Sequence, residues 1–235
     1  MTRRRWSVMA TRFLIWVRQV GALFNKDFKA EFRTKYALNS FLMFAVTTLV
    51  IVSFAAGPYH LDTIMHAAFL WIILFFSAMA GLARVFVKEE ERGTACALKL
   101  SVIPEIIFLG KFLFNFVLLL LVMVVVVPLY IFLLSPSVGN PGLLTAVLVL
   151  GSLGLTGTTT ILAAIVSRAN VKGNLMPVLA FPVLLPLLIT VINGTRLALE
   201  GYSFADGSAE LRVLLSFFFI IITISLMLFN YVWED

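Results

Sequence analysis

The sequence predicts an all-α integral membrane protein with six transmembrane helices. Its composition and the grouping of its apolar residues into blocks both lead to this prediction. Of the 235 residues, 61% are hydrophobic and only 13% are charged, whereas soluble domains are about half apolar and about a quarter charged. The mean hydropathy is +1.05. A soluble domain of this size needs a charged shell, and this chain has too few charged residues to form one.

The apolar residues fall into six runs, each long enough to cross a bilayer. A helix rises about 1.5 Å per residue and the hydrocarbon core is about 30 Å thick, so one span needs about 20 apolar residues. Helices are predicted because an open sheet would leave backbone groups unbonded in lipid. The predicted spans, which together form one transmembrane domain over residues 37–235, are 38–56, 63–83, 112–134, 142–166, 175–193 and 211–232.

The distribution of basic residues predicts the orientation of these spans. Sixteen Lys and Arg residues fall in the N-terminal segment and in the second and fourth connections, whereas the opposite side carries only Arg196 and Arg212. Cytoplasmic loops are rich in Lys and Arg. We therefore expect a multi-pass membrane protein with both termini in the cytoplasm. The net charge of +6 follows from this bias, and no nucleic-acid partner is expected.

Residues 1–36 form a separate cytoplasmic or interfacial segment. Apolar residues recur there at steps of three and four, and basic residues fill the other positions. This pattern predicts an amphipathic helix, with a break near Asn25, that lies at the membrane surface. Lipid phosphates would attract its cations. The helix could serve as an elbow that holds the first span against a partner, or simply as a membrane anchor.

The connection between spans two and three carries a compact charged segment followed by a predicted short helix. Thr94 is placed to cap this helix, which runs through Leu100, and Pro104 suits the first turn of the next span. The charged segment and its helix could dock on a soluble partner, with the acidic residues fixing the orientation. The alternative is a solvated connection without a partner. The docking residues would be Lys88, Glu89, Glu90, Glu91, Arg92, Gly93 and Thr94.

Other polar and small residues lie within the spans and have structural or pathway roles. Lys111 is expected to extend its ammonium back to the interface, and Asn115, one turn later, to bond to another helix. Small residues in span four predict close helix packing, and prolines in span five predict bends that are either fixed or hinges. The small residues are Gly151, Gly154 and Gly157, and the prolines are Pro182 and Pro186. These five residues, together with Lys111 and Asn115, could instead line a path for a polar solute.

No catalytic, metal or nucleotide site emerges from the sequence. His60 and His66 are the only histidines, and we expect them to be interfacial residues without a ligand, although they are weak candidates for binding haem. The Gly110-Lys111 step lacks the spacing of a Walker motif. The single cysteine, Cys96, excludes an intrachain disulfide. The chain is therefore expected to be no enzyme and to hold no cofactor or metal of its own.

Several segments resemble known membrane transporters. The Glu-Glu-Glu-Arg-Gly-Thr stretch at 89–94, together with six spans, resembles the type-2 family of ABC exporter permeases, in which the corresponding loop forms a coupling helix that sits in a cleft of the ATPase. A more specific resemblance, over about residues 21–201, is to the haem exporter protein B family (CcmB) of cytochrome c maturation. The segments that carry it are 26–39, 70–75, 101–111, 151–169 and 179–186.

This resemblance implies a permease subunit of the bacterial inner membrane that works with several partners. These are an ABC ATPase in two copies, a haem-handling membrane protein, a periplasmic haem chaperone and a second copy of the chain. ATP would be bound by the ATPase, and haem is the implied cargo. Hydrolysis would be coupled to haem export or to release of the haem chaperone.

Three alternatives stay open at this stage. The chain could be a type-2 permease for a lipid, a glycan or a drug, or a scaffold that couples an ATPase to a chaperone without transporting anything. It could also be a membrane haem enzyme that uses His60 and His66.

Overall fold

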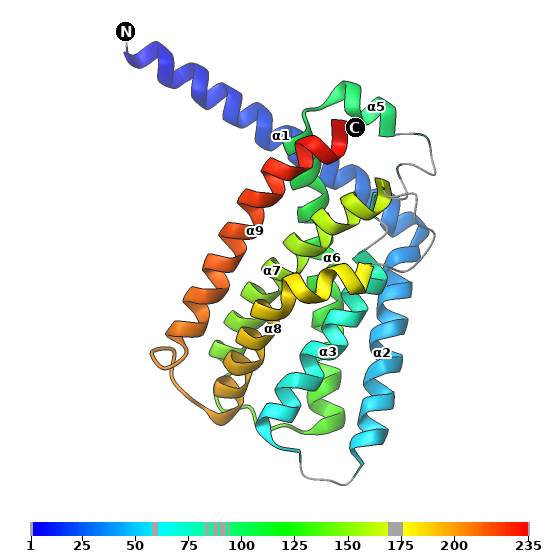
Figure 1. Cartoon of the computed structure of the whole chain (residues 1–235), viewed down its shortest axis with the longest axis vertical. Helices are drawn as coiled ribbons and strands as arrows, with labels where there is room; N and C mark the ends of the chain where they lie inside the picture. Colours follow the sequence, from blue (N-terminus) through cyan, green and yellow to red (C-terminus); the bar gives the residue numbers. More distant parts are fainter. Residues whose placement is uncertain are drawn as a thin grey trace.

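The computed structural model describes residues 2–57, 61–82, 85–86, 89, 93, 95–168 and 176–234. These residues form helices joined by turns, and no strand occurs among them (Figure 1). The helices are α1 Thr2–Thr34, α2 Tyr36–Ala56, α3 Thr63–Leu82, α5 Ala95–Ser101, α6 Pro104–Leu134, α7 Pro141–Arg168, α8 Met176–Glu200 and α9 Ser208–Glu234.

Six of these helices, α2, α3, α6, α7, α8 and α9, are long and apolar enough to cross a membrane. The predicted six-span fold is thus confirmed, although two boundaries differ from the prediction. The third span begins at Pro104 rather than at residue 112, because a lysine inside it is paired. The fifth continues to Glu200 rather than ending at 193, because Gly194 and Thr195 are buried against other helices.

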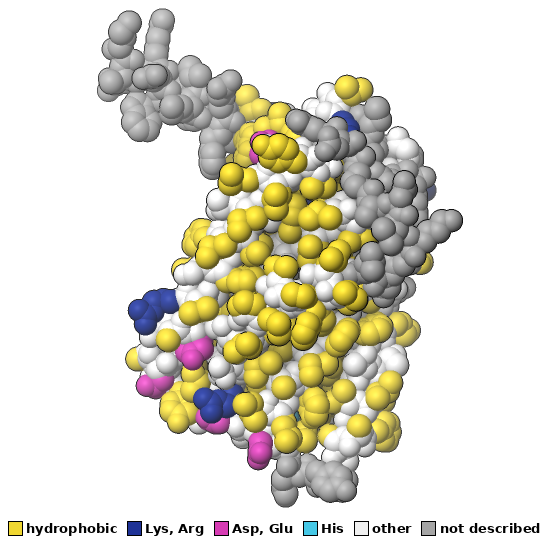
Figure 2. All heavy atoms as spheres, in the orientation of Figure 1, with side chains coloured by type: hydrophobic (Ala, Val, Ile, Leu, Met, Phe, Trp, Pro, Cys, Tyr) yellow, Lys and Arg dark blue, Asp and Glu magenta, His cyan; other side chains and the backbone are white. Residues whose placement is uncertain are grey.

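Helix α7 lies at the centre of the bundle. It contacts α3, α6, α8 and α9, and it is the most buried of the six spans. The outward faces of the other spans are apolar. Figure 2 shows hydrophobic side chains over the middle of the visible face, with charged side chains toward the end that carries the α8–α9 connection. This distribution suits a helical bundle surrounded by lipid.

Helix α1 is continuous, so the predicted break near Asn25 is wrong. One asparagine costs only a few tenths of a kcal/mol in a helix, and packing offsets this cost. The C-terminal half of α1 packs on α6, where Leu23 lies directly over Gly110. Both chain termini and α5 lie at the same end of the bundle, here called the terminal end (Figure 1).

The junction between α1 and α2 is held by a buried carboxylate. Lys35 adopts the left-handed conformation, with φ of 53°, and turns the chain between the two helices. Glu31, which is only 3% exposed, accepts hydrogen bonds from the backbone N–H groups of Ala37 and Leu38. A negative charge at a helix N-terminus also interacts favourably with the helix dipole. This cap fixes α1 to the first turn of the first span.

Candidate functional site

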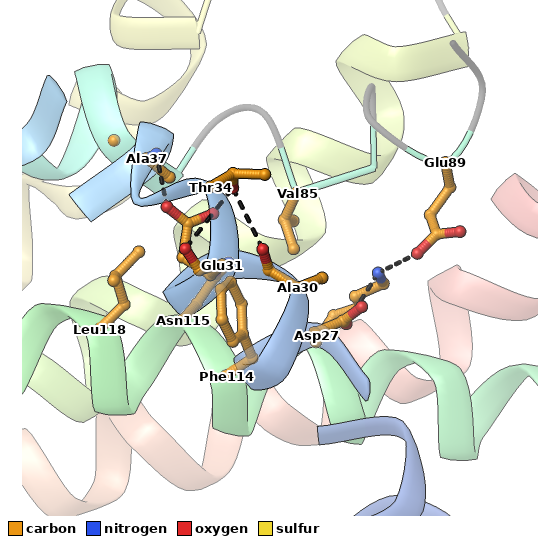
Figure 3. Close-up of a pocket in the computed structure, with 12 residues that line it drawn as sticks. Asp27, Ala30, Glu31, Thr34, Ala37, Val85, Glu89, Phe114, Asn115 and Leu118 are labelled. Atoms are coloured by element: carbon orange, nitrogen blue, oxygen red, sulfur yellow. Dashed lines mark hydrogen bonds and ion pairs between the residues drawn. The ribbon is translucent and has the colours of Figure 1, made fainter. Parts of the chain in front are cut away.

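Four charged side chains from three separate segments meet at the terminal end of the bundle. Lys26 and Asp27 come from α1, Lys111 from α6, and Glu89 from the connection between α3 and α5. The Lys111 Nζ lies 2.8 Å from Asp27 Oδ2 and 2.7 Å from Glu89 Oε1. Lys26 donates to the same Glu89 oxygen at 2.8 Å. We call these four residues the charge network; Figure 3 shows Asp27 and Glu89 facing each other across it.

The charge network is largely buried. The Lys111 side chain is 2% exposed, and those of Asp27 and Glu89 are 10% and 8% exposed, whereas Lys26 is 46% exposed. Charges buried to this degree are stable only when they are paired with good geometry. The expectation that Lys111 extends to the interface is therefore wrong. Two carboxylates from neighbouring segments reach its ammonium inside the protein, so it has no need to reach water.

A small cavity of about 40 Å³ adjoins the charge network. It is bounded by Glu31 of α1, by Gly81 of α3 and by Asn115 of α6. Figure 3 labels Glu31 and Asn115 beside it. The Asn115 Nδ2 donates to Thr160 Oγ1 of α7 at 3.0 Å. Its Oδ1 is buried and has no protein hydrogen-bond partner. A cavity of this size holds on the order of one to three water molecules, which would satisfy that oxygen.

The charged segment that the sequence predicts as a docking surface is described only in part. Glu89 is buried in the charge network and is not exposed on the surface; its part in coupling to an ATPase stays a prediction. Its partners are Lys26 and Lys111 of the same chain. Gly93 is exposed, with a φ of 65° that suits glycine. The remaining predicted docking residues, Lys88, Glu90, Glu91, Arg92 and Thr94, lie outside the described residues.

The short helix α5 follows this segment, and apolar side chains of α5 and of the residue before α6 face the outside. Leu100 is 86% exposed and Ile103 is 50% exposed. The Lys99 ammonium lies over the ring of Trp233 in α9, 5.9 Å from its centroid. A groove of about 390 Å³ runs between α5, Pro104 and Trp233. We call Lys99, Leu100, Ile103 and Trp233 the α5 surface.

The glycines of α7 lie where neighbouring side chains press against the helix. A Cβ at Gly151 would lie 2.7 Å from Val191 Cγ1 and would overlap the ring of Trp71. A Cβ at Gly154 would lie 2.8 Å from Leu187. At Gly157 the nearest atom would be Ile221 Cγ2 of α9, at 3.0 Å. These three positions bring α3, α8 and α9 close to α7 within one chain.

Pro182 and Pro186 lie inside α8 on its exposed face. They line neither the charge network nor its cavity. The structure therefore does not bring them together with Lys111 and Asn115.

Only one of the two histidines lies in the part of the chain that the structure describes. His60 lies outside the described residues. His66 is buried in the first turn of α3, at the end of the bundle opposite the termini. Its ring contacts Tyr130 of α6. In the part of the chain that the structure describes, no three metal-ligating side chains are grouped to hold an ion.

Sequence reasoning missed the α1 half of the charge network. A signal was present, because Asp27 and Glu31 are the only acidic residues among the first 36 and lie one helical turn apart. On a surface helix that faces lipid phosphates, two carboxylates on the same face indicate contacts within the protein. Their partners could not be identified, because each lies in another helix or connection.

Comparison with known proteins identifies the chain's relatives. A family model described as "CcmB protein" matches residues 18–231. The chain is similar to "Heme exporter protein B" of Bradyrhizobium diazoefficiens, with 27% identity over 184 residues, which is 77% of this chain and 83% of that protein. No solved structure matches the chain.

Proposed function

The chain belongs to the CcmB family, and from this premise we propose that it is the membrane permease subunit of an ABC-type complex that exports haem for cytochrome c maturation. The family match, which spans nearly the whole chain, is the observation that carries the proposal. Haem export is what the name of the Bradyrhizobium relative states of that protein. ATP is bound and hydrolysed by a separate partner, so this chain is not itself an enzyme.

The α5 surface is the proposed docking site of the ATPase. Leu100 and Ile103 are exposed apolar side chains at the very end of the bundle, beyond the spans. The groove beside them gives a partner side chain a place to insert. Lys99 and Trp233 hold α5 against the end of α9. A soluble subunit that covers this surface would remove apolar area from water, which favours association.

The charge network is the proposed mechanical link between the ATPase and the spans. Glu89 lies in the connection that leads into α5, and it is paired directly with Lys111 of α6 and Lys26 of α1. Movement of the α5 connection therefore pulls on two helices at once. Because the pairs that Lys111 forms with Glu89 and Asp27 are buried, they resist separation more strongly than surface pairs do. Force applied at α5 would thus reach the third span and the elbow helix together.

The proposed assembly contains two copies of the chain and two ATPase subunits. Paired nucleotide-binding subunits need two docking surfaces, and α5 provides one for each chain. The basic residues favour an orientation in the bacterial inner membrane with the terminal end in the cytoplasm. The haem-handling membrane protein and the haem chaperone would then act from the opposite, periplasmic end. Haem is the cargo of the complex.

The orientation can be tested with the only cysteine, Cys96, which lies in α5. In intact spheroplasts we expect a membrane-impermeant maleimide to leave Cys96 unlabelled, and a permeant maleimide to label it. The matched control is a Cys96→Ser, Ser203→Cys variant, because Ser203 lies in the exposed α8–α9 connection at the other end. That variant should react with the impermeant reagent. The reverse pattern would place α5 in the periplasm and contradict ATPase docking there.

The docking surface can be tested by Leu100→Asp. Co-expression with the ABC ATPase of a cytochrome c maturation system, followed by affinity purification, should recover at least about tenfold less ATPase than the unchanged chain. An aspartate would put a charge into a contact that excludes water. The matched control is Phe204→Asp, because Phe204 is 51% exposed at the opposite end. Equal recovery in both variants would exclude this surface.

The transport function is tested in proteoliposomes that contain the chain and the ATPase. We expect ATP-dependent accumulation of haem in the unchanged assembly and its loss with Leu100→Asp. ATP hydrolysis without haem movement would instead support the scaffold alternative.

A further inference from the structure

A second cavity lies at the end of the bundle opposite the termini, away from the charge network. Its volume is about 430 Å³. It is bounded by the end of α2, the start of α3 and the end of α6, it is partly open to the outside, and its lining mixes polar and apolar groups. Its lining includes Ser53 of α2, Thr63 and His66 of α3, Leu133 of α6, and Ser135, which follows α6. In Figure 1 these helix ends lie away from both termini.

Hydrogen bonding assigns the tautomer of His66 at this cavity. Tyr130 has one hydroxyl proton, and it donates this proton to the backbone carbonyl oxygen of His66 at 2.9 Å. The same hydroxyl oxygen lies 3.3 Å from His66 Nδ1. Because the tyrosine proton is already used, Nδ1 carries a proton and donates it to the tyrosine oxygen. Nε2 then carries a lone pair.

Nε2 is therefore the ring nitrogen of His66 that is left for a ligand. His66 is 8% exposed, and it is one of the residues that line the cavity. Among the described residues, its only side-chain hydrogen bond is the one through Nδ1. Histidines that bind metals commonly donate their other ring N–H to a fixed partner, which sets the tautomer and the ring orientation. Tyr130 provides such a partner for His66.

The surroundings favour a metalloporphyrin over a free metal ion. A protein site for a bare transition-metal ion needs three or four side-chain ligands, and no such group occurs in the part of the chain that the structure describes. Haem iron already has four porphyrin nitrogens, and it takes only its axial ligands from a protein. One neutral imidazole at the edge of a large cavity is therefore suited to haem.

We propose that His66 Nε2 is an axial ligand to the iron of haem in this cavity, with Tyr130 as the positioning residue. The proposal rests on the proposed haem-export function and adds a contact between the chain and its cargo. A haem in this cavity would lie at the end where the proposed orientation places the periplasm. Binding forms one Fe–N bond, displaces the weakly held ligand of free haem and requires no electron transfer.

The test is a titration of the purified full chain in detergent with haemin, followed by the Soret band. We expect saturable binding with a Soret position typical of nitrogen ligation. His66→Gln should weaken binding at least about tenfold, and Tyr130→Phe should weaken it severalfold while the Soret position is unchanged. His66→Gly should regain the band when imidazole is added, which a purely structural role would not produce. The matched control is His60→Gln, which changes the only other histidine and should leave binding unchanged.

Other ligands separate coordination from simple insertion into the cavity. Iron-free protoporphyrin should bind the unchanged chain and His66→Gln equally, since it cannot be ligated. Zinc ions alone should give no saturable heat in calorimetry. The proposal is overturned by equal haemin binding in the unchanged chain and His66→Gln, by tight binding of zinc alone, or by loss of the band only in His60→Gln. If haemin binding is equal but ATP-driven transport persists in proteoliposomes, the ligand assignment fails and the export function stands.

Discussion

Replacing Lys111 by methionine is expected to destabilise the protein by about 3–5 kcal/mol, because two buried carboxylates lose their common cation. Lys111 is 2% exposed and pairs with both Asp27 and Glu89. Methionine fills most of the volume of the lysine stem, so the effect comes from charge and not from a cavity. The measurement is the midpoint of unfolding in detergent, followed by intrinsic tryptophan fluorescence. A clear fall in the midpoint is expected.

Lys26→Met is the matched control for this prediction. Lys26 pairs with the same Glu89 oxygen but is 46% exposed, and exposed ion pairs contribute about 0–1 kcal/mol. The unfolding midpoint of Lys26→Met should therefore differ little from that of the unchanged chain. The triple variant Asp27→Asn, Glu89→Gln, Lys111→Met removes all three buried charges and should recover part of the lost stability. If Lys111→Met and Lys26→Met unfold at the same midpoint, the buried pairs do not stabilise the fold.

The same variants separate docking of the ATPase from coupling. The α5 surface is unchanged in the triple variant, so ATPase recovery in co-purification should be close to that of the unchanged chain. Haem accumulation in proteoliposomes should fall, because the connection to α5 is no longer paired with α1 and α6. Full haem transport by a well-folded triple variant would show that coupling takes another route.

Gly151→Val is the second substitution with a large expected effect. The Cβ alone would overlap the ring of Trp71 and lie 2.7 Å from Val191, and valine adds two methyl groups. Trp71 cannot swing away freely, because its Nε1 donates to Thr195 Oγ1 at 2.8 Å. Overpacking typically costs about 1–3 kcal/mol, and breaking the buried tryptophan bond adds about 1–3 kcal/mol. We expect a lower unfolding midpoint and a loosened contact between α3, α7 and α8.

Gly21→Ala is the matched control, because a Cβ at Gly21 has no other atom within 4 Å. Alanine is favoured over glycine inside a helix by about 1 kcal/mol, so this variant should be as stable as the unchanged chain or slightly more so. Trp71 fluorescence should change in Gly151→Val and stay the same in Gly21→Ala. A stable Gly151→Val with unaltered fluorescence would mean that the small residue is not required there.

The membrane class, the six spans and the short helix between the second and third of them could all be predicted from the amino-acid sequence. These properties depend on local quantities, namely the length of each apolar run, its helical rise and the positions of proline and glycine. The sequence also indicated that Asn115 would bond to another helix, although it did not identify Thr160 as the partner. The third and fifth spans are longer than predicted, because Lys111 and the 193–196 stretch remain helical when buried partners surround them.

Which side chains meet could be seen only once the helices were packed. Lys111 was expected at the interface and Glu89 on the surface, but each is the buried partner of the other, with Asp27 from a third segment. Likewise, the tautomer of His66 depends on a tyrosine from another helix. Ion pairs and hydrogen bonds act over a few ångströms between residues far apart in the chain. Hydropathy and spacing therefore predict where such residues lie along the helices, whereas packing of the helices determines their partners.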